Sequence, residues 1–175
     1  MGGQEVPAVV RFGFGFLQGA NYAANEDGKT VNIKYTYLNS FVENPNIQTQ
    51  ARSWYEGGTD CIFVAAGGAG GSVINAANTL DNKYVIGVDV DQSSKSEKVI
   101  TSAMKELTLT VEKVLDAIYK KKTDVFVPGK TTVLDITNNG VGLPDKFDRF
   151  KNFTKEQYTT IYTALQNNTD NIRTN

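Results

Sequence analysis

Two short, uninterrupted apolar runs constrain the fold of this chain most strongly. They cover residues 61–65 (CIFVA) and 84–88 (YVIGV), and neither shows the polar alternation of a strand with one face in water. A strand that is apolar on both sides is typical of a parallel sheet covered by helices on both faces. Patterns typical of helices lie between and around these runs, so the sequence predicts an α/β fold with a doubly wound, mostly parallel sheet.

Periodicity and capping signals place the other elements. Apolar residues at helical spacing predict helices over residues 8–24, 47–55, 71–80, 108–121 and 154–165. Alternation or short apolar runs predict further strands over residues 31–38, 99–102, 124–127 and 131–135. Thr154 and Gln157 have the spacing of a capping box at the start of the last helix. The polar tail, residues 166–175, is expected to fray.

The composition excludes several classes of function. The 175 residues contain no histidine, which removes Ser-His-Asp and Cys-His catalysis and the commonest metal ligand. The single cysteine, Cys61, lies in an apolar run and is expected to be a buried thiol. A net charge of −1 argues against nucleic acid as a partner. No apolar run is long enough to span a bilayer, and no signal-peptide pattern opens the sequence. These features favour a binding module over an enzyme, with no metal or cofactor.

Four features of different chemistry follow the predicted strands, each at the carboxyl end of its strand. They are the aromatic ring of Phe41, the bare backbone of Gly67 and Gly68, the carboxylate of Asp89 and the ammonium of Lys105. The carboxyl ends of parallel strands meet at one edge of a sheet, and ligands bind outside that edge. A ring, a backbone without side chains and two charges could together stack on a planar base and hydrogen-bond a polyol.

The glycine-rich loop allows two other interpretations. Gly68 and Gly70, with Asp89 further on, resemble a dinucleotide-binding fingerprint, which would suit an enzyme that uses a nicotinamide cofactor. Val73 stands where that fingerprint has its third glycine. The glycines could also form a purely structural turn. Asp91 is expected to be a turn residue or loop cap rather than a ligand contact.

Five segments in order resemble the motifs of the basic membrane protein (PnrA-like) family, the substrate-binding lipoproteins of ABC transporters. The segments are GGQEVPAVVRFGFGFLQG, GTDCIFVAAGGAGGSV, KYVIGVDVDQ, VITSAMK and NNGVGL. The resemblance implies a type I periplasmic-binding-protein fold, in which two doubly wound lobes close on a ligand. It implies that Phe41 stacks on a base, that Gly67 and Gly68 approach the ligand, that Asp89 takes ribose hydroxyls and that Lys105 lies at the hinge.

The resemblance also implies a longer protein with a first lobe before the segment that begins at Gly2. We therefore expect a fragment: residues 1–122 form the second ligand-binding lobe without its first strand, and residues 123–175 form the crossover segment to the first lobe and a C-terminal helix. The implied ligand is a purine nucleoside of the inosine, guanosine or adenosine class, and the implied partner is an ABC permease. The full-length protein would be held by a lipid anchor at the extracytoplasmic face of the cell membrane. A fragment without activity of its own is the remaining alternative.

Overall fold

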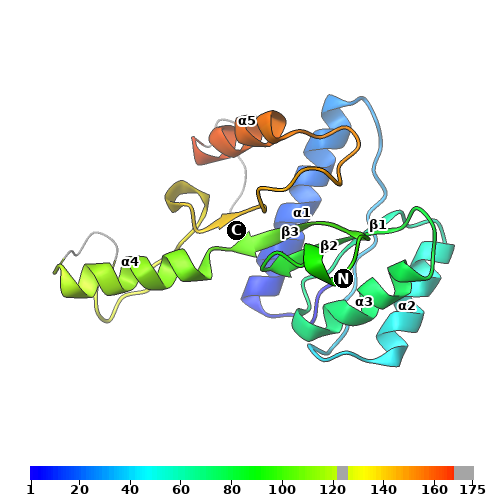
Figure 1. The fold of residues 1–175 in the computed structure, drawn as a ribbon, viewed down its shortest axis with the longest axis horizontal. Coiled ribbons are helices and arrows are strands. Elements are labelled where there is room, and N and C mark those ends of the chain that lie inside the picture. The colour runs from blue at the N-terminus through cyan, green and yellow to red at the C-terminus, as the bar shows by residue number, and fades with distance from the viewer. Residues whose placement is uncertain (122–125, 168–175) are drawn as a thin grey trace.

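A four-stranded sheet lies at the centre of the protein (Figure 1). The computed structural model describes residues 1–121 and 126–167. Strands β1 (Cys61–Phe63), β2 (Tyr84–Asp89) and β3 (Val99–Lys105) are parallel, and β4 (Val141–Gly142) pairs with β3 in the antiparallel direction. The predicted strands at 61–65, 84–88 and 99–102 are confirmed, with small differences in length. The mostly parallel sheet is the predicted one.

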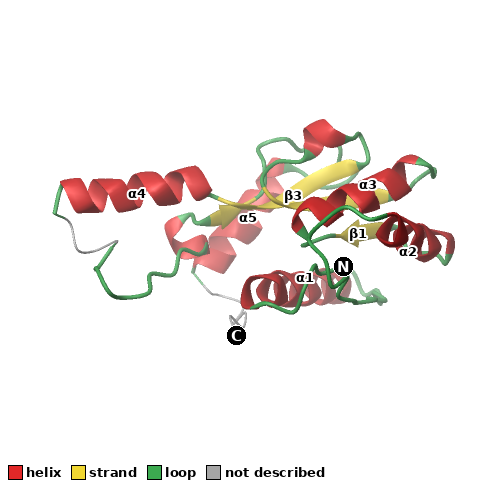
Figure 2. Ribbon diagram, turned by 90° about the horizontal axis from the view of Figure 1, so that it is seen from below, coloured by secondary structure: helices red, strands yellow, loops and turns green. Residues whose placement is uncertain are grey.

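Helices cover the two faces of this sheet, as Figure 2 shows. Alternate residues of a strand point to opposite faces, and Ile62 and Val64 belong to one core cluster whereas Phe63 and Ala65 belong to another. The first cluster is closed by α2 (Pro45–Glu56) and α3 (Gly70–Asn78), and the second by α1 (Pro7–Glu26). The continuous apolar runs in the sequence therefore reflect burial on both sides.

The first residues of the chain extend the parallel order beyond β1. Gly2 bridges Ala65 on one side and Tyr37 on the other, both in the parallel sense. Gly2 N donates to Thr36 O at 2.9 Å, and Gly3 N donates to Ala65 O at 2.9 Å. Residues 1–3 thus lie between β1 and the segment that ends at Leu38.

The predicted strand over residues 31–38 is wrong. Only Tyr37 makes a β-bridge, and residues 31–36 form no regular element. A strand needs a neighbour that supplies hydrogen bonds, and within the described part of the chain only the short segment 1–3 lies beside it. The prediction at 131–135 fails in the same way, since those residues are in no strand. Residues 124 and 125 of the predicted strand 124–127 lie outside the described residues, and 126–127 are in no strand.

Two helices begin at sequence signals. At α5 (Lys155–Gln166), Thr154 and Gln157 form the predicted capping box. At α2, Asn44 accepts from Asn46 N, and Pro45 occupies the first turn, where its missing N–H costs nothing. The tail at 168–175, expected to fray, lies outside the described residues.

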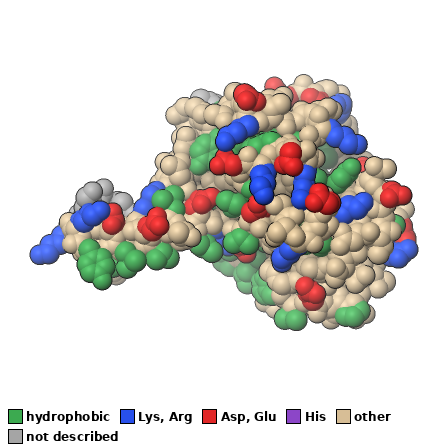
Figure 3. All heavy atoms as spheres, in the orientation of Figure 1, with side chains coloured by type: hydrophobic (Ala, Val, Ile, Leu, Met, Phe, Trp, Pro, Cys, Tyr) green, Lys and Arg blue, Asp and Glu red, His purple; other side chains and the backbone are tan. Residues whose placement is uncertain are grey.

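Helix α4 (Leu107–Tyr119) projects away from the sheet and carries an exposed apolar side (Figures 1 and 3). Its exposed apolar residues are Leu107, Val111, Leu115, Ile118 and Tyr119. Their spacing is that of one side of a helix, which normally packs against another element. The predicted amphipathic helix at 108–121 is therefore confirmed, but its apolar side is open.

The segment after residue 125 returns to the sheet through two contacts. β4 pairs with the end of β3, through Val141 opposite Lys105. Arg149 Nη1 then donates to the carbonyl oxygens of Ser93, Ser96 and Val99, at 3.0, 2.9 and 2.7 Å. Residues 126–167 are thus tied to the connection between β2 and β3.

Candidate functional site

The carboxyl ends of the parallel strands lie at one edge of the sheet, and the five predicted site residues all lie at this edge. Phe41 follows the Tyr37 bridge, Gly67 and Gly68 follow β1, Asp89 ends β2 and Lys105 ends β3. The order across the sheet runs from the 36–38 segment through residues 1–3 to β1, β2 and β3. The sequence therefore predicted correctly that these positions share an edge.

Phe41 lies against the glycines at one end of this edge. A Cβ built on Gly67 would lie 3.6 Å from Phe41 Cδ1, and one on Gly3 would lie 2.4 Å from Phe41 Cε1. Phe41 O accepts a hydrogen bond from Ala69 N at 3.0 Å. Phe41 as a whole residue is still 38% exposed. A ring held by backbone on one side and open on the other is suited to stacking.

The glycine loop, residues 67–71, packs directly against residues 41–43 of the same chain, and side chains at Gly68 and Gly71 would leave no space for this contact. A Cβ on Gly68 would lie 3.0 Å from Phe41 O, and one on Gly71 would collide with the Glu43 carboxylate. Gly67 also has φ +52°, a left-handed conformation that favours glycine. The structural-turn interpretation therefore accounts for part of this motif, because the loop and residues 41–43 pack directly together.

Asp89 and Lys105 form an ion pair at the other end of the edge. Lys105 Nζ lies 2.8 Å from Asp89 Oδ1, and both side chains are partly exposed. Asp89 adopts φ +69°, a left-handed conformation that Asp tolerates better than most residues. Lys105 Nζ also lies 5.1 Å from the centre of the Phe12 ring, within the range of a cation–π contact. The lysine is thus held between a carboxylate and an aromatic face.

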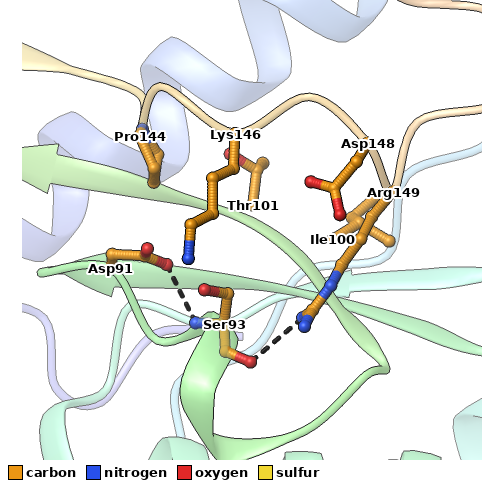
Figure 4. A pocket seen from close by; sticks show the side chains of 8 residues that line it. All are labelled: Asp91, Ser93, Ile100, Thr101, Pro144, Lys146, Asp148 and Arg149. Atoms are coloured by element: carbon orange, nitrogen blue, oxygen red, sulfur yellow. Dashed lines mark hydrogen bonds between the residues drawn. The ribbon is translucent and has the colours of Figure 1, made fainter.

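Asp91 is a loop cap, as predicted from the sequence. Its Oδ1 accepts from Ser93 N at 2.9 Å, and this backbone hydrogen bond is the largest factor that lowers the pKa of the carboxyl group. Asp91 also lines a cavity of about 150 Å³ beside the β2–β3 connection (Figure 4). Lys146 and Arg149 line the same cavity from the C-terminal segment.

Sequence reasoning missed Arg149, which binds three backbone carbonyls and pairs with Glu97 at 3.1 Å. No motif marks it, because its partners lie about fifty residues earlier in the chain. Cys61 is partly buried, and burial raises the pKa of its thiol to about 12. This thiol is therefore a poor nucleophile.

Neither a metal site nor a membrane span is found in the part of the chain that the structure describes. No group of three His, Cys, Asp or Glu side chains there is arranged to hold a metal ion. None of the helices described has the length and apolar character needed to cross a bilayer. Val73, at the third position of the dinucleotide fingerprint, lies on α3 and is fully buried in the core.

The fold is that of ABC transporter solute-binding proteins. A solute-binding protein from Aeropyrum pernix K1 matches with a TM-score of 0.71 at 20% identity, over 95% of this chain and 49% of that one. Another from Conexibacter woesei DSM 14684 matches with a TM-score of 0.68 at 20% identity, over 98% of this chain and 54% of that one.

The family follows from the sequence comparisons. Residues 1–170 match the model of the ABC transporter substrate-binding protein PnrA-like family, and the chain belongs to this family. Basic membrane protein B of Borreliella burgdorferi is 36% identical over 83% of this chain and 42% of its own length. The ABC transporter nucleoside-binding protein BmpA of Lactococcus lactis is 29% identical over 82% of this chain and 44% of its own length. The chain thus spans less than half the length of these curated relatives.

Proposed function

We propose that this chain contributes one side of a nucleoside site in the solute-binding component of an ABC transporter. The observation that carries the proposal is the placement of Phe41 and of the Asp89–Lys105 pair at a single edge of a parallel sheet. An open aromatic face can stack on a purine base. A carboxylate can accept charge-assisted hydrogen bonds from two ribose hydroxyls. The name of the Lactococcus lactis relative, a nucleoside-binding protein, supports the same class of ligand.

The site is open on the side away from the sheet. Phe41 is 38% exposed and the Asp89 side chain 39% exposed. Enclosure of a ligand would require a second surface that closes over this edge, as in hinge closure of two lobes. We therefore assign residues 1–122 to one lobe and residues 123–175 to the connection toward the other lobe. The chain alone should bind a nucleoside weakly.

In the whole protein, this site would capture a nucleoside of the inosine, guanosine or adenosine class at the extracytoplasmic face of the membrane. A lipid anchor would hold the protein there, and an ABC permease would receive the ligand. In this proposal the protein acts by binding and release and has no enzymatic step.

Amide chemical shifts recorded during titration with inosine test the proposal. We expect shifts at Gly67, Gly68 and Asp89 that do not saturate below about 1 mM ligand, since one open surface offers few contacts. NADH serves as the comparison ligand. If NADH moves these amides at lower concentration than inosine, the nicotinamide interpretation replaces this one. If inosine moves none of the three, the proposed site is wrong.

A further inference from the structure

Asp89, the carboxylate of the candidate site, lies in a sharp three-residue turn at the end of β2. Val90 N donates to Val88 O at 2.9 Å across this turn, and Asp89 between them has φ +69°. A γ-turn with a positive φ at its central residue is rare and strained. Such strain persists only where the surrounding structure enforces it. Contacts from outside the turn must therefore hold Asp89 in this conformation.

The side chain of Gln92 makes such a contact. Gln92 Nε2 donates to Val88 O at 2.9 Å, so this carbonyl accepts one bond from Val90 N inside the turn and another from the side chain outside it. A carbonyl oxygen has two lone pairs and can accept both bonds. Gln92 is only 7% exposed, so water competes little for its bond to the turn.

Two residues of the sheet fix Gln92 in place. Gln92 N donates to Ser102 Oγ at 3.0 Å, and Ser102 on β3 is fully buried. Gly87 on β2 lies directly opposite Ser102. A Cβ on Gly87 would lie 2.7 Å from Ser102 Oγ and 3.1 Å from both Cβ and Cδ of Gln92. The missing side chain of Gly87 thus leaves the space into which Gln92 packs.

The amide of Gln92 uses its donor and not its acceptor. Gln92 Oε1 is also buried, and it has no hydrogen-bond partner within the part of the chain that the structure describes. A buried acceptor without a partner costs free energy, so an apolar side chain of the same length would serve general packing equally well. A glutamine at this place is therefore explained by its Nε2 bond to Val88 O.

We propose that Gln92 is a positioning residue of the candidate ligand site, which holds the turn at Asp89 so that the carboxylate can accept hydrogen bonds from two sugar hydroxyls. This inference rests on the function proposed above and adds the residue on which recognition of the sugar depends. Hydrogen bonds require a narrow range of distance and direction. A change of φ at Asp89 would move its carboxylate away from Lys105, now 2.8 Å away, and from the ligand.

The variant Gln92→Met tests the proposal, because Met keeps the length of the side chain but cannot donate to Val88 O. The probes are inosine and 2′,3′-dideoxyinosine, which carries the same base without the two ribose hydroxyls. In amide-shift titrations of the unaltered chain, inosine should bind about tenfold more tightly than the dideoxy compound. In Gln92→Met we expect this ratio to fall to about two or below, with the affinity for dideoxyinosine unchanged within about twofold.

Hydrogen exchange at the Val90 amide reports the turn without any ligand. This amide should exchange at least about tenfold faster in Gln92→Met, because it bonds Val88 O only while the turn is held. The amide of Val85, a fully buried residue of the same strand, should keep its rate. Ser102→Ala removes the acceptor for Gln92 N, and this second variant should change the binding ratio and the Val90 exchange in the same direction.

Two control variants separate positioning from a general loss of stability. Tyr55→Phe removes a buried hydrogen bond from α2 to Tyr84 O, and it should leave the ratio of the two affinities unchanged. Gln50→Met makes the same substitution at an exposed position of α2 and should also leave the ratio unchanged. Urea unfolding verifies that each variant is folded under the conditions of the titration.

Three results would overturn the proposal. One is unchanged Val90 exchange in Gln92→Met. Another is an equal loss of affinity for inosine and dideoxyinosine, which a merely structural role of Gln92 predicts. The third is an unchanged ratio in both Gln92→Met and Ser102→Ala while Asp89→Asn abolishes it, and the proposed function would then hold without Gln92. If the unaltered chain binds both compounds equally or binds neither, the proposed function is wrong, and this inference is wrong with it.

Discussion

Asp89 and Lys105 form an ion pair across the carboxyl ends of two neighbouring parallel strands, with Oδ1 and Nζ 2.8 Å apart. The pair places both signs of charge at the edge where the aromatic ring of Phe41 also lies. The lysine orients the carboxylate, and the carboxylate retains acceptor capacity for a ligand, since an ionised carboxylate has about four lone-pair sites. The Asp89 carboxylate can therefore accept hydrogen bonds from the hydroxyl groups of a ligand while it remains paired with Lys105.

The Asp89→Asn variant should bind inosine about tenfold more weakly. Asn tolerates the left-handed backbone at this position, so the fold should persist, but the charge-assisted acceptor is lost. Amide-shift titration measures the change. Asp145→Asn is the control, because Asp145 pairs with Lys155 on the exposed start of α5. Equal affinities for the Asp89 variant and the control would show that the carboxylate takes no part in binding.

The buried Met1 amine should make stability depend on pH in a narrow window. Its pKa is lowered from 8.0 to about 6, so the unfolded chain binds more protons between these values. The free energy of unfolding should therefore rise by about 2–3 kcal/mol from pH 6 to pH 8 and lose this contribution on acidification. The chain has no histidine to titrate in the same window. Urea unfolding at several pH values measures the slope, and N-terminal acetylation should abolish it. If the pH dependence of the free energy of unfolding is unchanged after acetylation, it comes from a group other than the Met1 amine.

Tyr55 should contribute a buried hydrogen bond between α2 and the sheet. The residue is 1% exposed, and its hydroxyl donates to Tyr84 O at 2.8 Å. Tyr55→Phe leaves that carbonyl without this donor and should lower the free energy of unfolding by about 1–2 kcal/mol in urea titration. Tyr119→Phe is the matched control, since Tyr119 is 82% exposed on α4. A loss no larger than that of the control would show that water satisfies the carbonyl.

Arg149 should hold the C-terminal segment on the β2–β3 connection through its guanidinium geometry. Arg149→Lys keeps the charge but cannot reproduce bonds to three carbonyls, so we expect a loss of about 2 kcal/mol and faster amide exchange in residues 144–150. Arg52→Lys provides the comparison, because Arg52 makes an exposed pair with Glu56 on one helix. If the two lysine variants lose equal stability, the three carbonyl bonds are dispensable.

The elements that the sequence predicted well are those whose pattern reflects local burial or capping. The apolar runs at 61–65 and 84–88 became β1 and β2 because both faces of those strands are covered. The Thr154–Gln157 capping box depends on four consecutive residues, so it is visible in the sequence. Asp89 and Lys105 share an edge because each ends one of two neighbouring parallel strands that the sequence predicted. Phe41 reaches the same edge through the single bridge at Tyr37, although the strand predicted before it does not form.

What the sequence could not show depends on distant partners. Residues 31–36 have an alternating pattern typical of a strand, but strand formation requires a neighbour, and the pattern carries no information about one. The contacts of Arg149 with Val99 and of Met1 with Phe63 join residues at least fifty positions apart. The Asp89–Lys105 distance likewise depends on the register of two strands, which only the fold sets.

Saturation transfer from the protein to inosine tests the central claim most directly. We expect transfer to both base and ribose protons, with a Kd of about 1 mM or weaker, and its loss in the Phe41→Leu variant, which keeps an apolar side chain but removes the ring. No transfer, or transfer that persists unchanged in Phe41→Leu, would contradict binding at this edge.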